Sequence, residues 1–258
     1  MHPILIKLGN IHIYTYGVFV ALGLLTGLWV AIRAAKKAGI NAERIMDMAF
    51  FSALAGIAGA RLLYVILNID LFTGNPLGIF KIWEGGLVFY GGFIAAAATA
   101  FVYIKKHNMP LAITTDILAL AMPLGHAVGR IGCFFAGCCH GRITDLPVGV
   151  CFNDPNTLAR PMGVPLHPTQ LYSSAGNLLI FLILLTLHRT GRFKGKRIFV
   201  YVFLYGIFRS FIEIFRGDER GTVLVEWIST SQAIGLTAAL IAAICLFALR
   251  NRDTNGRD

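Results

Sequence analysis

Residues 14–32 read YTYGVFVALGLLTGLWVAI, a run of 19 residues without one charged side chain. A helix of roughly 20 apolar residues is long enough to cross the hydrocarbon core of a bilayer. Six further runs share this length and apolar character, and they lie at 46–67, 87–104, 113–135, 170–187, 198–215 and 227–249. The sequence therefore predicts an all-α integral membrane protein with seven transmembrane helices.

The composition of the whole chain agrees with this prediction. Of 258 residues, 56% are hydrophobic and 14% are charged, whereas an ordinary soluble domain has about 25% charged residues. The mean hydropathy of +0.69 excludes a soluble enzyme of this length. Because the sequence contains no internal repeat and no low-complexity tract, we expect a single polytopic membrane domain over residues 1–258.

The basic residues predict the orientation of the chain. The net charge of +10 would suggest nucleic-acid binding in a soluble protein. Here 14 of the 23 Lys and Arg residues follow the first, third, fifth and seventh apolar runs, whereas six lie on the opposite side. The positive-inside rule therefore predicts an N-terminus outside and a cytoplasmic C-terminus. The basic surplus then serves topology and contact with membrane lipids, and no nucleic-acid partner is expected.

Two irregular segments indicate where a site could lie. Pro123, Gly125, Gly129 and Gly132 fall inside the fourth apolar run, which predicts a broken fourth helix beside a wet cavity. Residues 140–168 then contain five of the nine prolines. On the predicted topology this segment is an ordered extracytoplasmic loop above that cavity.

The charged residues within or at the margin of the predicted spans include Arg61, Arg130, Arg209, Asp116 and Glu213. Each intramembrane charge costs at least about 2.5 kcal/mol, so it requires a partner or a ligand. Glu213 could neutralise Arg209 one helical turn away. For Arg61, snorkelling and a functional role are equally plausible. For Arg130 and Arg209, the shortage of carboxylates favours an anionic substrate.

The sixth run carries a polar stripe. Tyr205, Arg209 and Glu213 follow one another at intervals of four residues, and Arg216 comes next at the membrane edge. Residues at this spacing share one helix face, which must point toward protein or water and not toward lipid. Tyr205 is also too far from the end of the run to belong to an interfacial aromatic belt.

In the third run, Tyr90 precedes a glycine pair formed by Gly91 and Gly92. Paired glycines permit the backbone to approach either a neighbouring helix or a ligand. Both interpretations remain open for the two glycines, whereas helix packing does not explain Tyr90.

The fourth run ends in a cysteine-rich segment with Cys133, Cys138, Cys139 and His140. These residue types bind metals, but adjacent Cys-Cys-His lacks the paired spacing of known sites, so we expect no metal. A disulfide, for example with Cys151, and simple packing both remain possible. The expected titrating groups are three histidines: His126, His140 and His167.

Taken together, these segments resemble the prolipoprotein diacylglyceryl transferase family of bacterial inner membranes. The match lies in the order and spacing of short motifs along most of the chain. These motifs are Tyr14-Thr15-Tyr16-Gly17, Gly59-Ala60-Arg61-Leu62, Trp83-Glu84-Gly85-Gly86, Tyr90-Gly91-Gly92, Gly129-Arg130-Ile131-Gly132, His167-Pro168-Thr169-Gln170-Leu171-Tyr172, and the segment from Tyr205 to Arg216.

The resemblance implies a multi-pass enzyme of the bacterial inner membrane that needs no cofactor. It implies transfer of the diacylglyceryl group from phosphatidylglycerol to the thiol of the lipobox cysteine in the signal peptide of a prolipoprotein. The products are a thioether and glycerol phosphate. A transporter or binding protein for an anionic lipid or solute is the alternative, although the sequence lacks the repeat symmetry of many transporters.

The resemblance also implies roles for individual residues. Arg130 and Arg209 would hold the phosphate and stabilise charge on the leaving group, with Tyr90 as the third catalytic residue. The implied substrate-binding residues are Tyr16, Arg61, Gly91, Gly92, Gly129, Cys133, Cys138, Gly141, His167, Tyr205, Glu213 and Arg216.

Three positions depart from the pattern of many family members. Tyr90 stands in place of a histidine, Cys133 in place of an asparagine and Cys138 in place of a glutamate. A tyrosine, with a pKa near 10, is a poor base for a thiol. Tyr90 could instead orient the phosphate, and the arginine charges could lower the pKa of the substrate thiol so that a dedicated base is less necessary.

Overall fold

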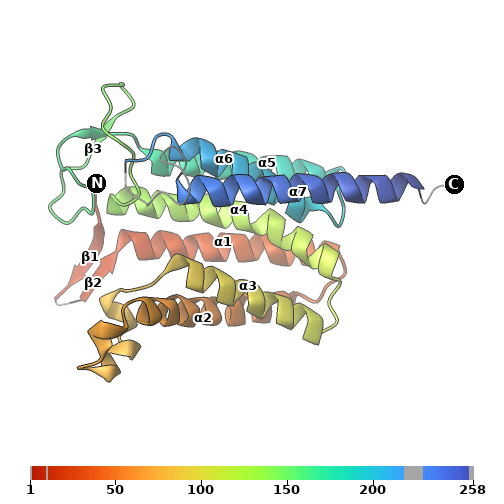
Figure 1. Cartoon of the computed structure of the whole chain (residues 1–258), viewed down its shortest axis with the longest axis horizontal. Coiled ribbons are helices and arrows are strands. Elements are labelled where there is room, and N and C mark those ends of the chain that lie inside the picture. The colour runs from red at the N-terminus through yellow and green to blue at the C-terminus, as the bar shows by residue number, and fades with distance from the viewer. Residues whose placement is uncertain (1, 10, 218–228, 256–258) are drawn as a thin grey trace. The chain divides into compact units, whose positions relative to one another are not determined.

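The computed structural model describes residues 2–9, 11–217 and 229–255. Seven α-helices lie within these ranges (Figure 1). They are α1 (Thr15–Lys37), α2 (Ala42–Leu67), α3 (Phe89–Lys106), α4 (Leu111–Ala136), α5 (Thr169–Arg189), α6 (Arg197–Glu213) and α7 (Thr230–Asn255). Each helix coincides with one predicted apolar run. The predicted start of the seventh run, at residues 227 and 228, lies outside the described residues.

Five of these helices, α1, α2, α4, α5 and α7, are long and apolar enough to cross a membrane. Helices α3 and α6 are shorter, with 18 and 17 residues. At a rise of about 1.5 Å per residue, each is slightly shorter than a hydrocarbon core of about 30 Å. The apolar helices identify the chain as a multi-pass membrane protein.

The contacts within the chain divide it into two compact units. The first unit comprises Met1–Ala31 and Thr115–Asp258, and the second comprises Ile32–Thr114. Helices α1 and α4 each contribute residues to both units.

Helices α1 and α4 of the first unit approach closely at glycines. A Cβ atom on Gly23 would lie 2.6 Å from the carbonyl oxygen of Gly125, and one on Gly132 would lie 2.8 Å from the Cβ of Phe19. The predicted break in the fourth helix is wrong, because α4 continues through Pro123 as one helix (Figure 1). Proline removes a single N–H donor from a helix of 26 residues, and Gly125 and Gly132 serve helix packing.

Among the remaining helices of the first unit, α5 packs against α6 and α6 packs against α7. Gly206 of α6 faces Gly235 of α7 at close range. At the turn before α6, Asp116 accepts hydrogen bonds from the backbone N–H groups of Gly195 (2.5 Å) and Arg197 (2.7 Å). Asp116 also forms a buried ion pair with the Arg197 side chain at 3.3 Å. Asp116 therefore stabilises the turn between α5 and α6.

The segment between α4 and α5 forms an ordered loop with two short antiparallel strands, β3 (Val150–Cys151) and β4 (Pro165–Leu166). Phe152, Ala159 and Leu166 form a small buried core within it. The chain also begins with a hairpin of β1 (Ile4–Leu8) and β2 (Ile11–Tyr14), which the sequence analysis did not predict. The predicted loop thus has a hydrophobic core of its own.

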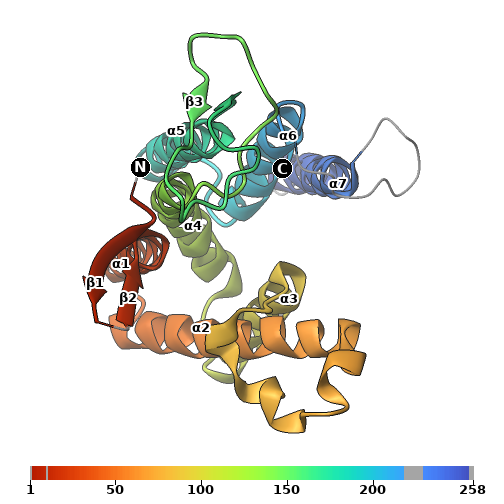
Figure 2. The ribbon, with the colours of Figure 1, turned by 90° about the vertical axis from the view of Figure 1, so that its left-hand side faces the viewer.

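In the second unit, α2 and α3 pack through small residues. A Cβ atom on Gly91 would meet the backbone of Gly59, and one on Gly92 would lie 2.9 Å from the carbonyl oxygen of Gly56. Between α2 and α3 the chain turns through three short 3₁₀ helices (Figure 2). They are η1 (Ile69–Phe72), η2 (Pro76–Phe80) and η3 (Ile82–Glu84).

Candidate functional site

Arg130 lies near the C-terminal end of α4, and its hydrogen-bond partner is a histidine one turn earlier. Its Nε donates a hydrogen bond to Nε2 of His126 at 3.2 Å. An imidazole nitrogen that accepts this bond carries no proton, so the ring is neutral in this arrangement. Among the described residues, no carboxylate forms an ion pair with Arg130. Its charge is therefore available to an anionic ligand.

The polar stripe of α6 continues the site. Arg209 forms an ion pair with Glu213, as the sequence analysis allowed, and Arg216 Nε lies 4.0 Å from the same carboxylate. The Oγ of Ser229 donates a further hydrogen bond to Glu213 at 3.0 Å. Arg130 and Arg209 both lie within electrostatic range of His126, so the two arginines belong to one site. We call Arg130, Arg209 and Arg216 with Glu213 the arginine cluster.

Tyr205 and Tyr16 border this cluster. The Tyr205 ring lies 5.5 Å from the ring of His126, measured between centroids. Tyr16, in the first turn of α1, is 45% exposed and lies within electrostatic range of Arg130 and of the thiols at the end of α4. A Cβ atom on Gly129 would meet nothing within 4 Å. The position that a side chain at residue 129 would occupy is therefore open.

Three cysteines come together where α4 ends. The sulfur atoms of Cys133, Cys138 and Cys139 all lie within 4.8 Å of one another, and each residue is half-buried. The chain reverses here because Gly137 and Cys139 adopt left-handed backbone conformations, with φ of +76° and +61°. We call these three residues the thiol cluster. All five cysteines of the chain are free, so the structure contains no disulfide with Cys151.

The first turn of α5 holds this reversal in place. Thr169 Oγ1 donates to the carbonyl oxygen of Cys139 at 2.7 Å, and Gln170 Nε2 donates to that of Cys138 at 2.8 Å. Both side chains are fully buried. Hydrogen bonds from the thiols of Cys133 and Cys138 lower the pKa of the Cys139 thiol, and the charges of Arg130 and Arg216 act in the same direction.

Gly141 and His167 fasten the loop to the helices beside the cluster. The Gly141 N–H donates to the His167 carbonyl oxygen at 2.8 Å, and Gly141 pairs with Arg216 in an antiparallel bridge. His167 is buried, with its Nδ1 3.3 Å from the Tyr172 hydroxyl and its ring 5.3 Å from that of Phe215. Both residues position the arginine cluster through the backbone.

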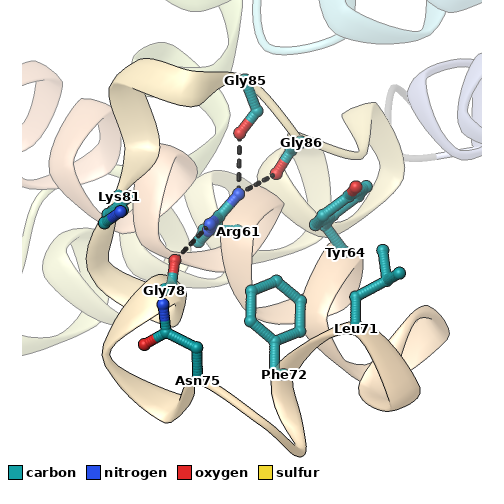
Figure 3. A pocket seen from close by; sticks show the side chains of 9 residues that line it. All are labelled: Arg61, Tyr64, Leu71, Phe72, Asn75, Gly78, Lys81, Gly85 and Gly86. Carbon is teal, nitrogen blue, oxygen red and sulfur yellow. Dashed lines mark hydrogen bonds between the residues drawn. The ribbon is translucent and has the colours of Figure 1, made fainter.

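Arg61 of the second unit binds the connection between α2 and α3 (Figure 3). Its Nε donates to the carbonyl oxygen of Ile79 at 2.8 Å and its Nη2 to that of Gly78 at 2.7 Å. Its Nη1 donates to Gly85 at 2.7 Å and to Gly86 at 3.1 Å. The residue is only 7% exposed. Its guanidinium group is therefore largely saturated by backbone carbonyls.

The surroundings of Arg61 agree with a structural role. The guanidinium carbon lies 5.4 Å from the centre of the Tyr64 ring and 5.5 Å from that of Phe72. These residues line a cavity of about 250 Å³. Tyr90, in the first turn of α3, is 46% exposed, whereas Gly91 and Gly92 lie against α2. For these two glycines the structure favours helix packing over contact with a ligand.

Sequence reasoning missed two parts of the site. It considered His126 only as a possible titrating group, although the four-residue spacing from Arg130 places both side chains on one helix face. It also assessed the cysteines from their linear spacing, whereas the left-handed conformation at Cys139 brings their sulfurs together. Non-glycine residues seldom adopt a left-handed conformation, so the sequence does not predict it at Cys139.

The helices and the arginine cluster define a multi-pass membrane protein with a cationic site among apolar helices. The family model described as prolipoprotein diacylglyceryl transferase matches residues 3–248, and the chain belongs to this family. The family expected from the motifs is thereby confirmed, and with it the enzyme class of a transferase in lipoprotein biosynthesis.

Curated relatives resemble the chain over nearly its whole length. A protein of Clostridium tetani is 39% identical over 241 residues, which cover 93% of this chain and 95% of that protein. A protein of Finegoldia magna is 35% identical, with 95% and 94% covered. One of Clostridioides difficile is 32% identical, with 95% and 96% covered. All three are named phosphatidylglycerol–prolipoprotein diacylglyceryl transferase.

Proposed function

We propose that the chain transfers the diacylglyceryl group of phosphatidylglycerol to the thiol of the lipobox cysteine in a prolipoprotein. The reaction forms a thioether and releases glycerol phosphate. The observation that carries this proposal is Arg130, which has a neutral histidine as its hydrogen-bond partner and no carboxylate among the described residues as an ion-pair partner. A phosphate group would supply the missing negative charge.

The chemistry requires alignment and charge stabilisation more than a protein nucleophile. The sulfur attacks the glyceryl carbon that bears the phosphate, so that a C–S bond forms and a C–O bond breaks. The electron pair of the broken bond leaves on the phosphate oxygen. Arg130 and Arg209 stabilise this developing charge, because guanidinium groups bind phosphate oxygens through paired donors.

The other residues near the cluster position these arginines or border the ligand. His126 orients Arg130, and Glu213 orients Arg209 and Arg216. Tyr16, Tyr205, Cys133 and Cys138 border the space that the lipid and the substrate thiol occupy. Gly141 and His167 act by holding the loop.

Residues of the second unit have separate proposed roles. Tyr90 serves the reaction either as a base or by orienting the phosphate. Arg61, Gly91 and Gly92 support substrate binding indirectly, because their observed contacts stabilise the second unit.

We further propose seven membrane spans within a single domain in the bacterial inner membrane, with the N-terminus outside and the C-terminus in the cytoplasm. The excess of Lys and Arg after alternate helices supports this topology. The loop at 140–168 then lies on the extracytoplasmic side, where signal peptides of prolipoproteins emerge. The partners are phosphatidylglycerol, the lipobox and membrane lipids, and no nucleic acid.

A direct assay tests this function. Purified protein is incubated with phosphatidylglycerol and a lipobox peptide, and mass spectrometry detects the diacylglyceryl thioether. The product should disappear with Arg130→Ala and with a peptide whose cysteine is replaced by alanine. Absence of product from wild-type protein that still binds the lipid would contradict the proposal and favour the transporter or binding protein.

A further inference from the structure

The thiol cluster has nearly the geometry of a tetrahedral metal site. Zinc binds thiolate sulfur at about 2.3 Å, which places the sulfurs of a tetrahedral site about 3.8 Å apart. The three sulfurs here lie within 4.8 Å of one another. Each pair would therefore need to close by about 1 Å at most.

The backbone around the cluster is built to hold these sulfurs. Cys139 keeps a left-handed conformation (φ +61°), which is unfavourable for a residue with a side chain. The buried side chains of Thr169 and Gln170 bind the carbonyl groups of the turn and maintain it. A strained backbone held by buried hydrogen bonds is typical of functional sites.

The ligand set leaves one coordination position open. His140 follows directly, but its Nδ1 lies 2.9 Å from the Gly141 carbonyl oxygen and its Nε2 accepts a hydrogen bond from Arg160 N–H at 3.4 Å. Its ring nitrogens are thus engaged elsewhere. A zinc site with three protein ligands and one open position is the catalytic kind. Because the three cysteines are half-buried, that position is accessible.

We propose that Cys133, Cys138 and Cys139 bind one Zn²⁺ ion as thiolates, and that the open position takes the sulfur of the lipobox cysteine. This inference rests on the proposed function, because it assigns a binding place to the substrate thiol. Three thiolates and Zn²⁺ carry a net charge of −1, which the nearby Arg130 and Arg216 would balance.

A zinc ion would make a protein base for the substrate thiol unnecessary. A thiol that coordinates zinc loses its proton, which passes to water, and stays a nucleophilic thiolate. The zinc-bound sulfur then attacks the glyceryl carbon while the C–O bond breaks, and the electron pair leaves on the phosphate oxygen next to Arg130. Zinc keeps its oxidation state throughout, and Tyr90 need not remove a proton.

From the sequence alone, the expectation at these cysteines is that no metal binds. That expectation depended on the linear spacing of adjacent cysteines, whereas the turn at 137–139 brings Cys133 to the same point as Cys138 and Cys139. Metal binding depends on the distances between the three sulfur atoms in the folded chain, and not on the number of residues between the cysteines.

Metal analysis of the full-length protein tests the site. We expect about one zinc per chain after purification under reducing conditions with added Zn²⁺. Protein loaded with Co²⁺ should show thiolate-to-cobalt absorption and the visible bands of a tetrahedral site. The lipobox peptide should change the visible bands, whereas the peptide with alanine in place of cysteine should not. Cys138→Ser should lose most of the metal, and the matched controls Cys151→Ser and Cys245→Ser should keep it.

Several results would overturn the inference. These are the absence of stoichiometric metal, retention of zinc after replacement of all three cysteines by serine, or a disulfide within the cluster of the active protein. Metal-free protein that forms the thioether at the full rate would overturn the zinc site and leave the transferase intact. Zinc-loaded protein that binds the peptide but forms no thioether would overturn the transferase and leave the zinc site intact.

Discussion

Arg61 and Arg130 are both arginines of apolar helices, but their surroundings differ. Arg61 is buried and donates hydrogen bonds to four backbone carbonyls. Arg130 donates a hydrogen bond to one neutral histidine and forms no ion pair with a carboxylate of the described residues. An arginine in an apolar helix therefore indicates a ligand only when the protein itself leaves its donors unsatisfied.

The largest expected effect follows removal of Arg130. Arg130→Ala should lower kcat/KM by about 10²–10³-fold, because one group that stabilises leaving-group charge is lost. The melting temperature in detergent should change less than the kinetics, because the guanidinium group donates a hydrogen bond to a single described residue, His126. Kinetics and thermal unfolding of the same preparation check both points. Near-wild-type kinetics would remove Arg130 from the proposed mechanism.

Arg61→Ala should chiefly affect stability. Hydrogen bonds to charged groups contribute about 1.5–3 kcal/mol each, and their loss leaves several carbonyls of the α2–α3 connection without a donor. We expect a clearly lower melting temperature and faster proteolysis between residues 69 and 86. Arg61→Lys should restore only part of the loss, because one ammonium group cannot reach carbonyls on several sides. Unchanged stability would contradict the role assigned to Arg61.

Substitutions at Gly91 and Gly129 should affect stability differently in the two units. Gly91→Ala should destabilise the protein by about 1–3 kcal/mol, because its Cβ would clash with the backbone of Gly59. Gly129→Ala should leave stability unchanged or raise it by about 0.5–1 kcal/mol, since its Cβ meets open space and alanine favours a helix. It should instead raise KM for phosphatidylglycerol. Equal effects of the two substitutions on folding would refute the distinction.

The smallest expected effect concerns the positioning of Arg130 by His126. His126→Ala should lower kcat by up to about tenfold, which corresponds to the loss of one hydrogen bond. His126→Gln should recover much of the activity, because an amide oxygen also accepts from a guanidinium group. If His126→Gln is as impaired as His126→Ala, acceptance of this hydrogen bond is not the role of His126.

The sequence predicted all seven helices, because long apolar runs leave few alternatives to a buried helix. It also identified the arginines, since charges are conspicuous in such runs. It did not predict the continuous α4, because proline and glycine residues in a sequence are compatible both with a broken helix and with a continuous helix that packs closely against α1. The partners of Arg61 and the thiol cluster were equally hidden, because they depend on carbonyl directions and on the left-handed turn at Cys139.

The most direct test of the central claim compares lipids with and without the phosphate. Binding of phosphatidylglycerol and of diacylglycerol is measured for wild-type protein, Arg130→Ala and the folded fraction of Arg61→Ala. We expect wild type and Arg61→Ala to prefer phosphatidylglycerol, and Arg130→Ala to lose most of that preference. If Arg130→Ala retains the preference, Arg130 does not bind the lipid phosphate.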